Sequence, residues 1–179
     1  MFEAQKIIFT GPVGVGKTTA ITAISDELPM QTEATASDET SLLKENTTVA
    51  MDYGTLRLDD GGIVHLYGTP GQDRFDFMWD ILSQSGIGLV LLLDNTREDP
   101  LADMSHYLNA FKDFITDREV VIGVNRYDAK NRPGLYSYHT RLEEHGMHAP
   151  VFEIDSREKD DIKVLLLALL AMLDPSLKR

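Results

Sequence analysis

The chain of 179 residues contains no cysteine. This absence excludes disulfides, thiolate metal sites, a cysteine nucleophile, and prenyl or palmitoyl anchors. The N-terminus shows no signal-peptide pattern, and Phe2 stands where myristoylation requires glycine. The longest uninterrupted apolar run, Val164 to Leu173, is too short to cross a bilayer. We therefore expect a cytoplasmic protein without a lipid anchor.

Positive charge is scarce. The chain has 17 Lys and Arg residues against 29 Asp and Glu residues, a formal net charge of −12. Such an acidic surface repels phosphate backbones and anionic lipids, so we expect neither a nucleic-acid partner nor a polybasic membrane contact. Hydrophobic residues make up 42% of the chain. That share suits a proper core, and we expect a single domain covering residues 1–179.

Short apolar runs alternate with helical patterns along the chain, which predicts an α/β fold. We expect a mostly parallel six-stranded sheet with one antiparallel hairpin strand and helices on both faces. The glycines of Asp59-Asp60-Gly61-Gly62 form the hairpin turn. The expected strands cover 6–10, 49–58, 63–67, 89–94, 120–125 and 151–154, and the expected helices 16–28, 72–85, 100–116, 135–145 and 160–173.

A glycine-rich segment between the first strand and the first helix fits the phosphate-loop pattern G-x-x-x-x-G-K-[ST]. Its glycines let successive backbone N–H groups curl around phosphate oxygens, and the helix N-terminus adds its dipole. Lys17 is expected to reach the β- and γ-phosphates and to assist catalysis, while the Thr18 hydroxyl ligates Mg²⁺. The predicted nucleotide-binding residues here are Gly11, Pro12, Val13, Gly14, Val15, Gly16, Lys17, Thr18 and Thr19.

An Asn-x-x-Asp pattern, Asn125 to Asp128, follows a buried strand at the edge where such folds bind ligands. The Asp128 carboxylate matches the N1–H and N2 amine of guanine, whereas adenine has no donor pair there. Asn125 would support the base and tie two loops together. A helix-capping Asn and a turn Asp are the alternative, which the preceding phosphate loop disfavours.

Together these motifs resemble the Ras-like small GTPases over essentially the whole chain. Asn125-Arg126-Tyr127-Asp128 is similar to the family's Asn-Lys-x-Asp, with Arg126 in place of Lys. Ser156 and Arg157 stand where the family has its last base-contacting loop, so the resemblance implies that the Ser156 N–H contacts guanine O6.

The resemblance also implies two switch segments, at about 29–53 and 68–85. Thr48, favoured over Thr47 by register, would bind Mg²⁺ and the γ-phosphate. Gly71 would bind the γ-phosphate, and Gln72 would orient the attacking water. The segment 29–47 would be a loop that becomes ordered with the γ-phosphate; an ordinary surface loop is the alternative.

Gly68 departs from the family, which has a magnesium-binding Asp at that place. This loss resembles the bacterial MglA-like branch, which pairs with Roadblock-type regulators. Asp52, on the strand paired with Gly68 in the hairpin, is our candidate replacement as a metal ligand. Alternation along a strand fixes the face of the side chain but not its reach, so a solvent-facing Asp52 stays open.

The expected function is a magnesium-dependent GTP switch with slow intrinsic GTPase activity that a regulatory protein stimulates. Two alternatives stay open: a GTP-bound scaffold with negligible hydrolysis, and an ATP-using kinase-like protein. The apolar cluster Phe75–Trp79 and the outer face of the last helix are candidate surfaces for a partner or a second copy. Arg74 is more suited to partner contact than to a built-in arginine finger.

Overall fold

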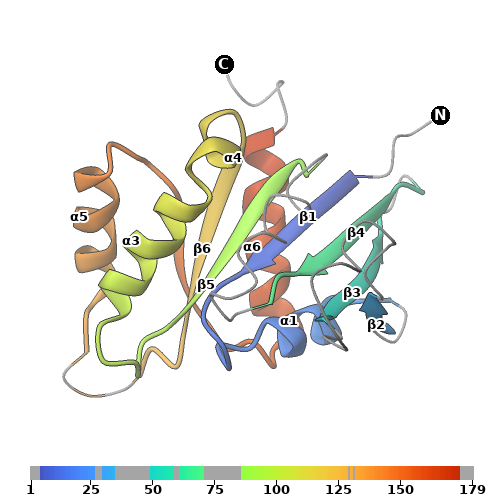
Figure 1. The fold of residues 1–179 in the computed structure, drawn as a ribbon, viewed down its shortest axis with the longest axis horizontal. Coiled ribbons are helices and arrows are strands. Elements are labelled where there is room, and N and C mark those ends of the chain that lie inside the picture. The colour runs from blue at the N-terminus through green and yellow to red at the C-terminus, as the bar shows by residue number, and fades with distance from the viewer. Residues whose placement is uncertain are drawn as a thin grey trace, which may run out of the picture.

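The computed structural model describes most of the chain as strands packed between helices (Figure 1). The described residues are 5–26, 30–34, 49–58, 61–70, 86–128, 130 and 132–173. The strands are β1 (Gln5–Thr10), β2 (Met30–Ala34), β3 (Val49–Arg57), β4 (Ile63–Gly68), β5 (Gly88–Asp94), β6 (Glu119–Asn125) and β7 (Val151–Ile154). The helices are α1 (Lys17–Ile24), α3 (Pro100–Ala110), α4 (Lys112–Thr116), α5 (Leu135–Glu144) and α6 (Lys159–Leu173).

The strands form one sheet in the order β2-β3-β4-β1-β5-β6-β7. Pairing is parallel from β4 through β7, while β3 is antiparallel to both of its neighbours. Only β3 therefore runs against the other described strands, which confirms the predicted α/β class. The sheet has one strand more than predicted, because residues 30–34 pair with β3 as β2 instead of forming loop.

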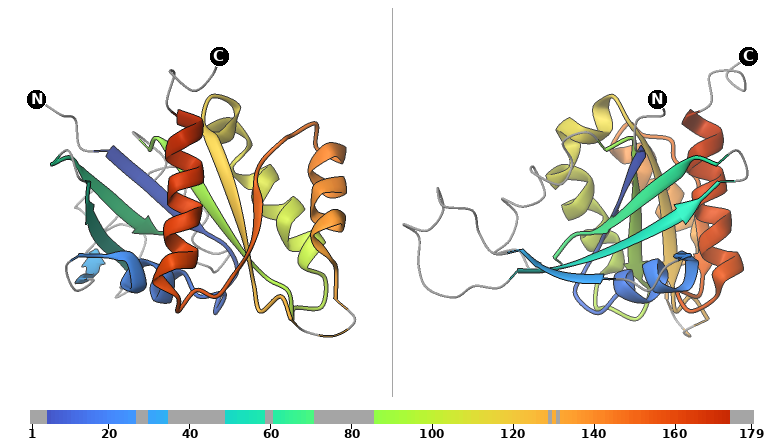
Figure 2. Two further views of the ribbon diagram at one scale, coloured as in Figure 1. Left: turned by 180° about the vertical axis from the view of Figure 1, so that it is seen from behind. Right: turned by 90° about the vertical axis from the view of Figure 1, so that its right-hand side faces the viewer.

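Helices cover both faces of the sheet (Figure 2). On one face, α1 and α6 pack against buried side chains of the central strands, with Ile21 and Leu165 fully buried. On the other face, α3 and α5 enclose a second core around Met104 and Tyr138. The seven residues of β5 are all buried, as expected for a strand covered on both sides.

Two predicted helices differ from their sequence patterns, one in where it ends and one in its continuity. Helix α1 ends at Ile24 because Ser25 adopts extended backbone angles and donates its hydroxyl to the Ile21 carbonyl. The predicted helix 100–116 is divided at Phe111, which leaves helical geometry while its ring stays in the core. Apolar periodicity continues across both positions, so it does not reveal either break.

The outward face of α6 carries apolar side chains, as the sequence indicates. Val164 and Leu167 are 44% and 55% exposed, although the inward residues of the same helix are buried. Within the described ranges, no helix has both the length and the apolar character needed to span a membrane.

The parallel arrangement brings several strand ends to one edge of the sheet. β1, β5, β6 and β7 point their carboxyl ends in the same direction, and each continues into a loop there. Because β3 runs the opposite way, its early residue Asp52 lies opposite Gly68, the last residue of β4. This edge therefore gathers the predicted site residues that belong to the described chain.

Candidate functional site

The loop between β1 and α1 contains glycines in backbone conformations that other residues rarely adopt. Gly11 has φ of 141°, and a Cβ there would lie 2.2 Å from the Leu92 carbonyl oxygen. Gly16 has φ of 109°, and a Cβ there would lie 2.4 Å from the Ser156 hydroxyl oxygen. Both positive φ and close approach thus require glycine at these two positions.

Gly16 is also the N-cap of α1, and no side chain caps the helix there. A helix leaves the N–H groups of its first turn without partners inside the helix, and the helix dipole makes that end attractive to anions. Because no side chain caps this end, its N–H groups stay available to an anion, as the sequence analysis predicts for phosphate.

Lys17 folds back over this loop. Its ammonium donates hydrogen bonds to the carbonyl oxygens of Gly11, at 2.6 Å, and Pro12, at 2.9 Å. The side chain is buried, and burial lowers the pKa of Lys17 to about 8, although the negative charge of Asp52 opposes that change. The cation therefore lies inside the loop with a reduced affinity for its proton.

Asp52 faces α1 instead of solvent, because its carboxylate oxygen Oδ2 accepts a hydrogen bond from the Thr18 hydroxyl at 2.5 Å. Gly68 provides the space for that carboxylate. A Cβ at Gly68 would lie 2.9 Å from the Asp52 Cβ and 3.1 Å from its Oδ2, closer than ordinary contacts. The Asp52 carboxylate can therefore occupy this place only because position 68 has no side chain.

Thr18 and Asp52 together form a pair of oxygen donors suited to Mg²⁺, which prefers hydroxyl, carboxylate, phosphate and water oxygens. Among the described residues, no group of three His, Cys, Asp or Glu side chains is placed to hold a metal ion. A magnesium ion here would therefore take its remaining ligands from phosphate and water, as this ion does in nucleotide sites.

Asn125 joins three loops. Its amide nitrogen donates to the Val15 carbonyl at 2.9 Å and to the Ser156 hydroxyl at 3.0 Å, and all three groups are buried. The same side chain accepts a hydrogen bond from the Arg126 N–H at 3.0 Å. The phosphate loop, the loop after β6 and the loop after β7 are thereby held in one arrangement.

Arg126 adopts left-handed backbone geometry, with φ of 54°, which is uncommon for a residue with a side chain. Its guanidinium pairs with the carboxylate of Asp94 and donates through Nη2 to the Gly14 carbonyl at 3.2 Å. Asp94 is itself held by the Thr96 N–H and hydroxyl. Arg126 thus forms a second link from the loop after β6 to the phosphate loop.

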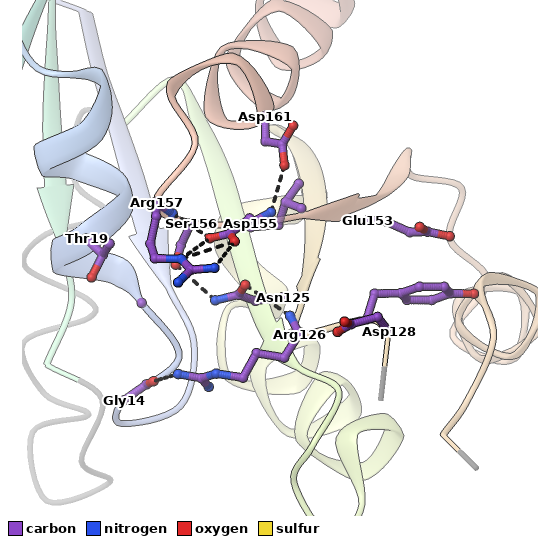
Figure 3. Close-up of a pocket in the computed structure, with 13 residues that line it drawn as sticks. Gly14, Thr19, Asn125, Arg126, Asp128, Glu153, Asp155, Ser156, Arg157 and Asp161 are labelled. Atoms are coloured by element: carbon purple, nitrogen blue, oxygen red, sulfur yellow. Dashed lines mark hydrogen bonds and ion pairs between the residues drawn. The ribbon is translucent and has the colours of Figure 1, made fainter. Parts of the chain in front are cut away.

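These loops surround a pocket of about 670 Å³, within the range typical of small-molecule sites (Figure 3). Asp128, an exposed residue, lies on one side of it, and the loop after β7 lies on another. The lining residues are Gly14, Gly16, Thr19, Asn125, Arg126, Tyr127, Asp128, Glu153, Ile154, Asp155, Ser156, Arg157 and Asp161.

The pocket brings together residues that the sequence analysis assigned to phosphate and to base. Their individual roles stay predictions. Three predicted site residues, Thr48, Gly71 and Gln72, lie outside the described residues, as do Arg74 and the cluster Phe75–Trp79. Of the two expected switch segments, the structure consequently describes only residues 30–34, 49–53 and 68–70.

Sequence analysis missed two acidic residues of this edge. Asp94 is the last residue of β5 and pairs in register with Asn125. A carboxylate at the end of a buried strand could have indicated in the sequence that Asp94 lies at this edge. Asp155 lies beside the predicted Ser156 and accepts hydrogen bonds from Arg157. Spacing alone does not reveal this pair, because the two residues are only two positions apart in a loop.

The sheet, the glycine loop and the pocket define a P-loop-type nucleotide-binding protein. The chain belongs to the family described as conserved hypothetical ATP binding protein, whose model matches residues 9–173. It is also similar to an uncharacterized protein of Methanocaldococcus jannaschii, with 34% identity over 91 residues, which is 50% of this chain and 51% of the relative. The chain thus spans about half the length of the curated relative it matches.

The lowered pKa of Lys17 predicts proton uptake when a nucleotide binds. Phosphate charge should return the Lys17 pKa toward its ordinary value, so binding should take up about half a proton at pH 8 and nearly one at pH 9. Calorimetry in buffers of different ionisation enthalpy measures this uptake. Lys17→Arg, which does not titrate, should bind without it. Zero uptake by the unsubstituted protein at pH 9 would contradict the prediction.

Proposed function

We propose that this protein is a guanine-nucleotide switch that hydrolyses GTP to GDP and phosphate. The observation that carries the proposal is the shared pocket, in which Asn125 and Asp128 stand beside the glycines of the phosphate loop. A purine nucleotide with its phosphates on that loop has its base directed toward these two residues. The pocket volume of about 670 Å³ suits a ligand of that size.

The base preference follows from the chemistry of Asp128. A carboxylate accepts hydrogen bonds and donates none when ionised, so it pairs with the N1–H and N2 amine of guanine. Adenine has an acceptor at N1 and would leave this carboxylate unpaired, a loss on the order of a few kcal/mol. The family description names ATP, and adenine nucleotides are therefore the second candidate.

Magnesium belongs to the same proposal, with Thr18 and Asp52 as the residues that would hold it. When bound, the ion would neutralise charge on the phosphate oxygens. The Thr18 hydroxyl donates a hydrogen bond to the Asp52 carboxylate, which leaves the lone pairs of the hydroxyl oxygen available to a cation. The proposal includes a relationship to the MglA-like branch and a Roadblock-type regulator, on the ground that a carboxylate stands at Asp52 beside Thr18 and none stands at Gly68.

Hydrolysis would proceed by attack of a water oxygen on the γ-phosphorus, with cleavage of its bond to the β–γ bridging oxygen. Lys17 and the amides of the phosphate loop would stabilise the charge that accumulates on the phosphoryl oxygens. Gln72 would orient the water. Loss of the γ-phosphate would release the segments that contain Thr48 and Gly71 and so change partner affinity.

Base selection is tested by calorimetry with GDP and ADP. We expect GDP to bind at least about 100-fold more tightly, because only guanine pairs with Asp128. Asp128→Asn should lose affinity for GDP and gain affinity for xanthosine diphosphate, whose carbonyl at position 2 pairs with an amide donor. Glu153→Gln removes a carboxylate from the same pocket and should keep the preference. Equal affinity for ADP, or no binding, would overturn the proposal.

Single-turnover phosphate release from bound GTP separates the switch from a GTP-bound scaffold. We expect slow release in Mg²⁺, and at least about tenfold slower release from Gln72→Leu with unchanged GDP affinity. A parallel reaction in EDTA is the control. Nucleotide that stays bound as GTP for hours would favour the scaffold.

The role of Asp52 is tested by moving its carboxylate. Asp52→Ala should reduce magnesium-dependent nucleotide affinity by about 10- to 100-fold, since the Thr18 hydroxyl loses its partner. The double variant Asp52→Gly with Gly68→Asp should recover part of it, because it also removes the Asp52 Cβ, which would lie 2.9 Å from a Cβ at position 68, and so lets a carboxylate return beside Thr18. Asp117→Ala, an exposed residue elsewhere, is the matched control. Full magnesium dependence in Asp52→Ala would contradict this role.

A further inference from the structure

The loop after β7 carries a fully paired carboxylate in the wall of the pocket. Asp155 accepts from the Arg157 guanidinium through Nε, at 2.9 and 3.1 Å, and through Nη2, at 2.5 Å. It also accepts from the Arg157 backbone N–H at 2.9 Å. These hydrogen bonds lower the pKa of Asp155 to about 2, so the carboxylate is ionised throughout the physiological range.

The backbone between these two side chains is fixed. Ser156 is buried, accepts from Asn125 at 3.0 Å and lies against Gly16. The Asp155 N–H donates to the Asp161 carboxylate at 2.8 Å. The ion pair therefore keeps its place in the pocket wall, on a different side from Asp128 (Figure 3).

The other guanidinium of the pocket acts on Asp155 as a nearby positive charge, a smaller cause of its lowered pKa than the Arg157 hydrogen bonds. Arg126 reaches away from the loop after β7, to Asp94 and the Gly14 carbonyl. Asp128, Glu153, Asp155 and Asp161 all line the pocket, so the charge of Arg157 offsets part of a strongly negative wall. Without that guanidinium, Asp155 would keep the hydrogen bond from the Arg157 backbone N–H but would face the ligand with its negative charge no longer offset by Arg157.

The position of Asp128 determines which atom of a purine meets this loop. If Asp128 pairs with the N1–H and N2 amine, the substituent at C6 lies next to that pair. We take the loop after β7, which follows the neighbouring strand and lines the same pocket, as the wall that this substituent meets. Guanine has a carbonyl oxygen there, which is an acceptor, and adenine has an amine, which is a donor. A carboxylate whose charge is not offset would repel the guanine carbonyl oxygen and accept a hydrogen bond from the adenine amine.

We propose that the Asp155–Arg157 pair sets the preference at the 6-position of the base, with Arg157 neutralising Asp155 so that a 6-carbonyl is accepted and a 6-amine is not favoured. The inference rests on the proposed guanine site and adds a second specificity determinant to Asp128. Removal of the guanidinium charge alone should therefore change base preference and not simply weaken binding.

The test measures dissociation constants for GDP, inosine diphosphate and ADP by calorimetry in four proteins: unsubstituted, Arg157→Gln, Arg157→Lys, and the double variant Asp155→Asn with Arg157→Gln. Arg157→Gln should lower the ratio of ADP to GDP dissociation constants about tenfold. The affinity for inosine diphosphate should fall in parallel with that for GDP, because the two bases share the 6-carbonyl. Since inosine lacks the N2 amine, a parallel fall assigns the effect to the 6-position. The Arg157 side chain is 78% exposed, so the fold should tolerate these changes.

Arg157→Lys keeps the positive charge at position 157 and should keep the ratio of ADP to GDP dissociation constants. The double variant should restore that ratio, because no carboxylate remains at position 155. Equal weakening of all three nucleotides in Arg157→Gln, or no rescue by the double variant, would show a merely structural pair and overturn the inference. The unsubstituted protein reports separately on the proposed function. If it binds ADP as tightly as GDP, that function fails and the inference that rests on it fails as well. If it prefers GDP but Arg157→Gln leaves the ratio of dissociation constants unchanged, the inference alone fails. Absence of binding by every protein would overturn both.

Discussion

The hydrogen bonds of the Asn125 amide are the interaction on which the site depends. One side chain joins the Val15 carbonyl of the phosphate loop to the Ser156 hydroxyl of the loop after β7. All of these groups are buried, where an unpaired polar atom costs about 1–3 kcal/mol. The tie thus holds three loops together, and residues of all three line one continuous pocket.

The carboxylate beside the Thr18 hydroxyl belongs to Asp52, while position 68, on the paired strand, is a glycine. A carboxylate beside the Thr18 hydroxyl can come from either of two paired strands, since the two residues face each other across the antiparallel register. The close approach at Gly68 leaves room for only one of them. A motif that lacks its acidic residue therefore does not by itself indicate a missing metal site, and the paired strand must be inspected as well.

Strand positions and the phosphate loop could be predicted because their signals are local. Buried runs such as β5 and the glycine pattern of the loop both appear within a few residues. Strand β2 was missed, since residues 30–34 lack apolar alternation and depend on the edge of β3 for their pairing. The links from Arg126 to Asp94 and from Arg157 to Asp155 were also missed. Side-chain direction at a loop, including the left-handed backbone of Arg126, is not encoded in spacing.

Val15 and Asn125 lie 110 positions apart in the sequence and are joined by a hydrogen bond in the fold. The cavity therefore exists only once the central strands have assembled, and no early fragment of the chain contains it. A nucleotide that binds the native state and not the unfolded chain shifts the folding equilibrium by mass action. Occupancy and thermal stability are then two readouts of one equilibrium, so the cellular nucleotide concentration helps to set how much of this protein is folded.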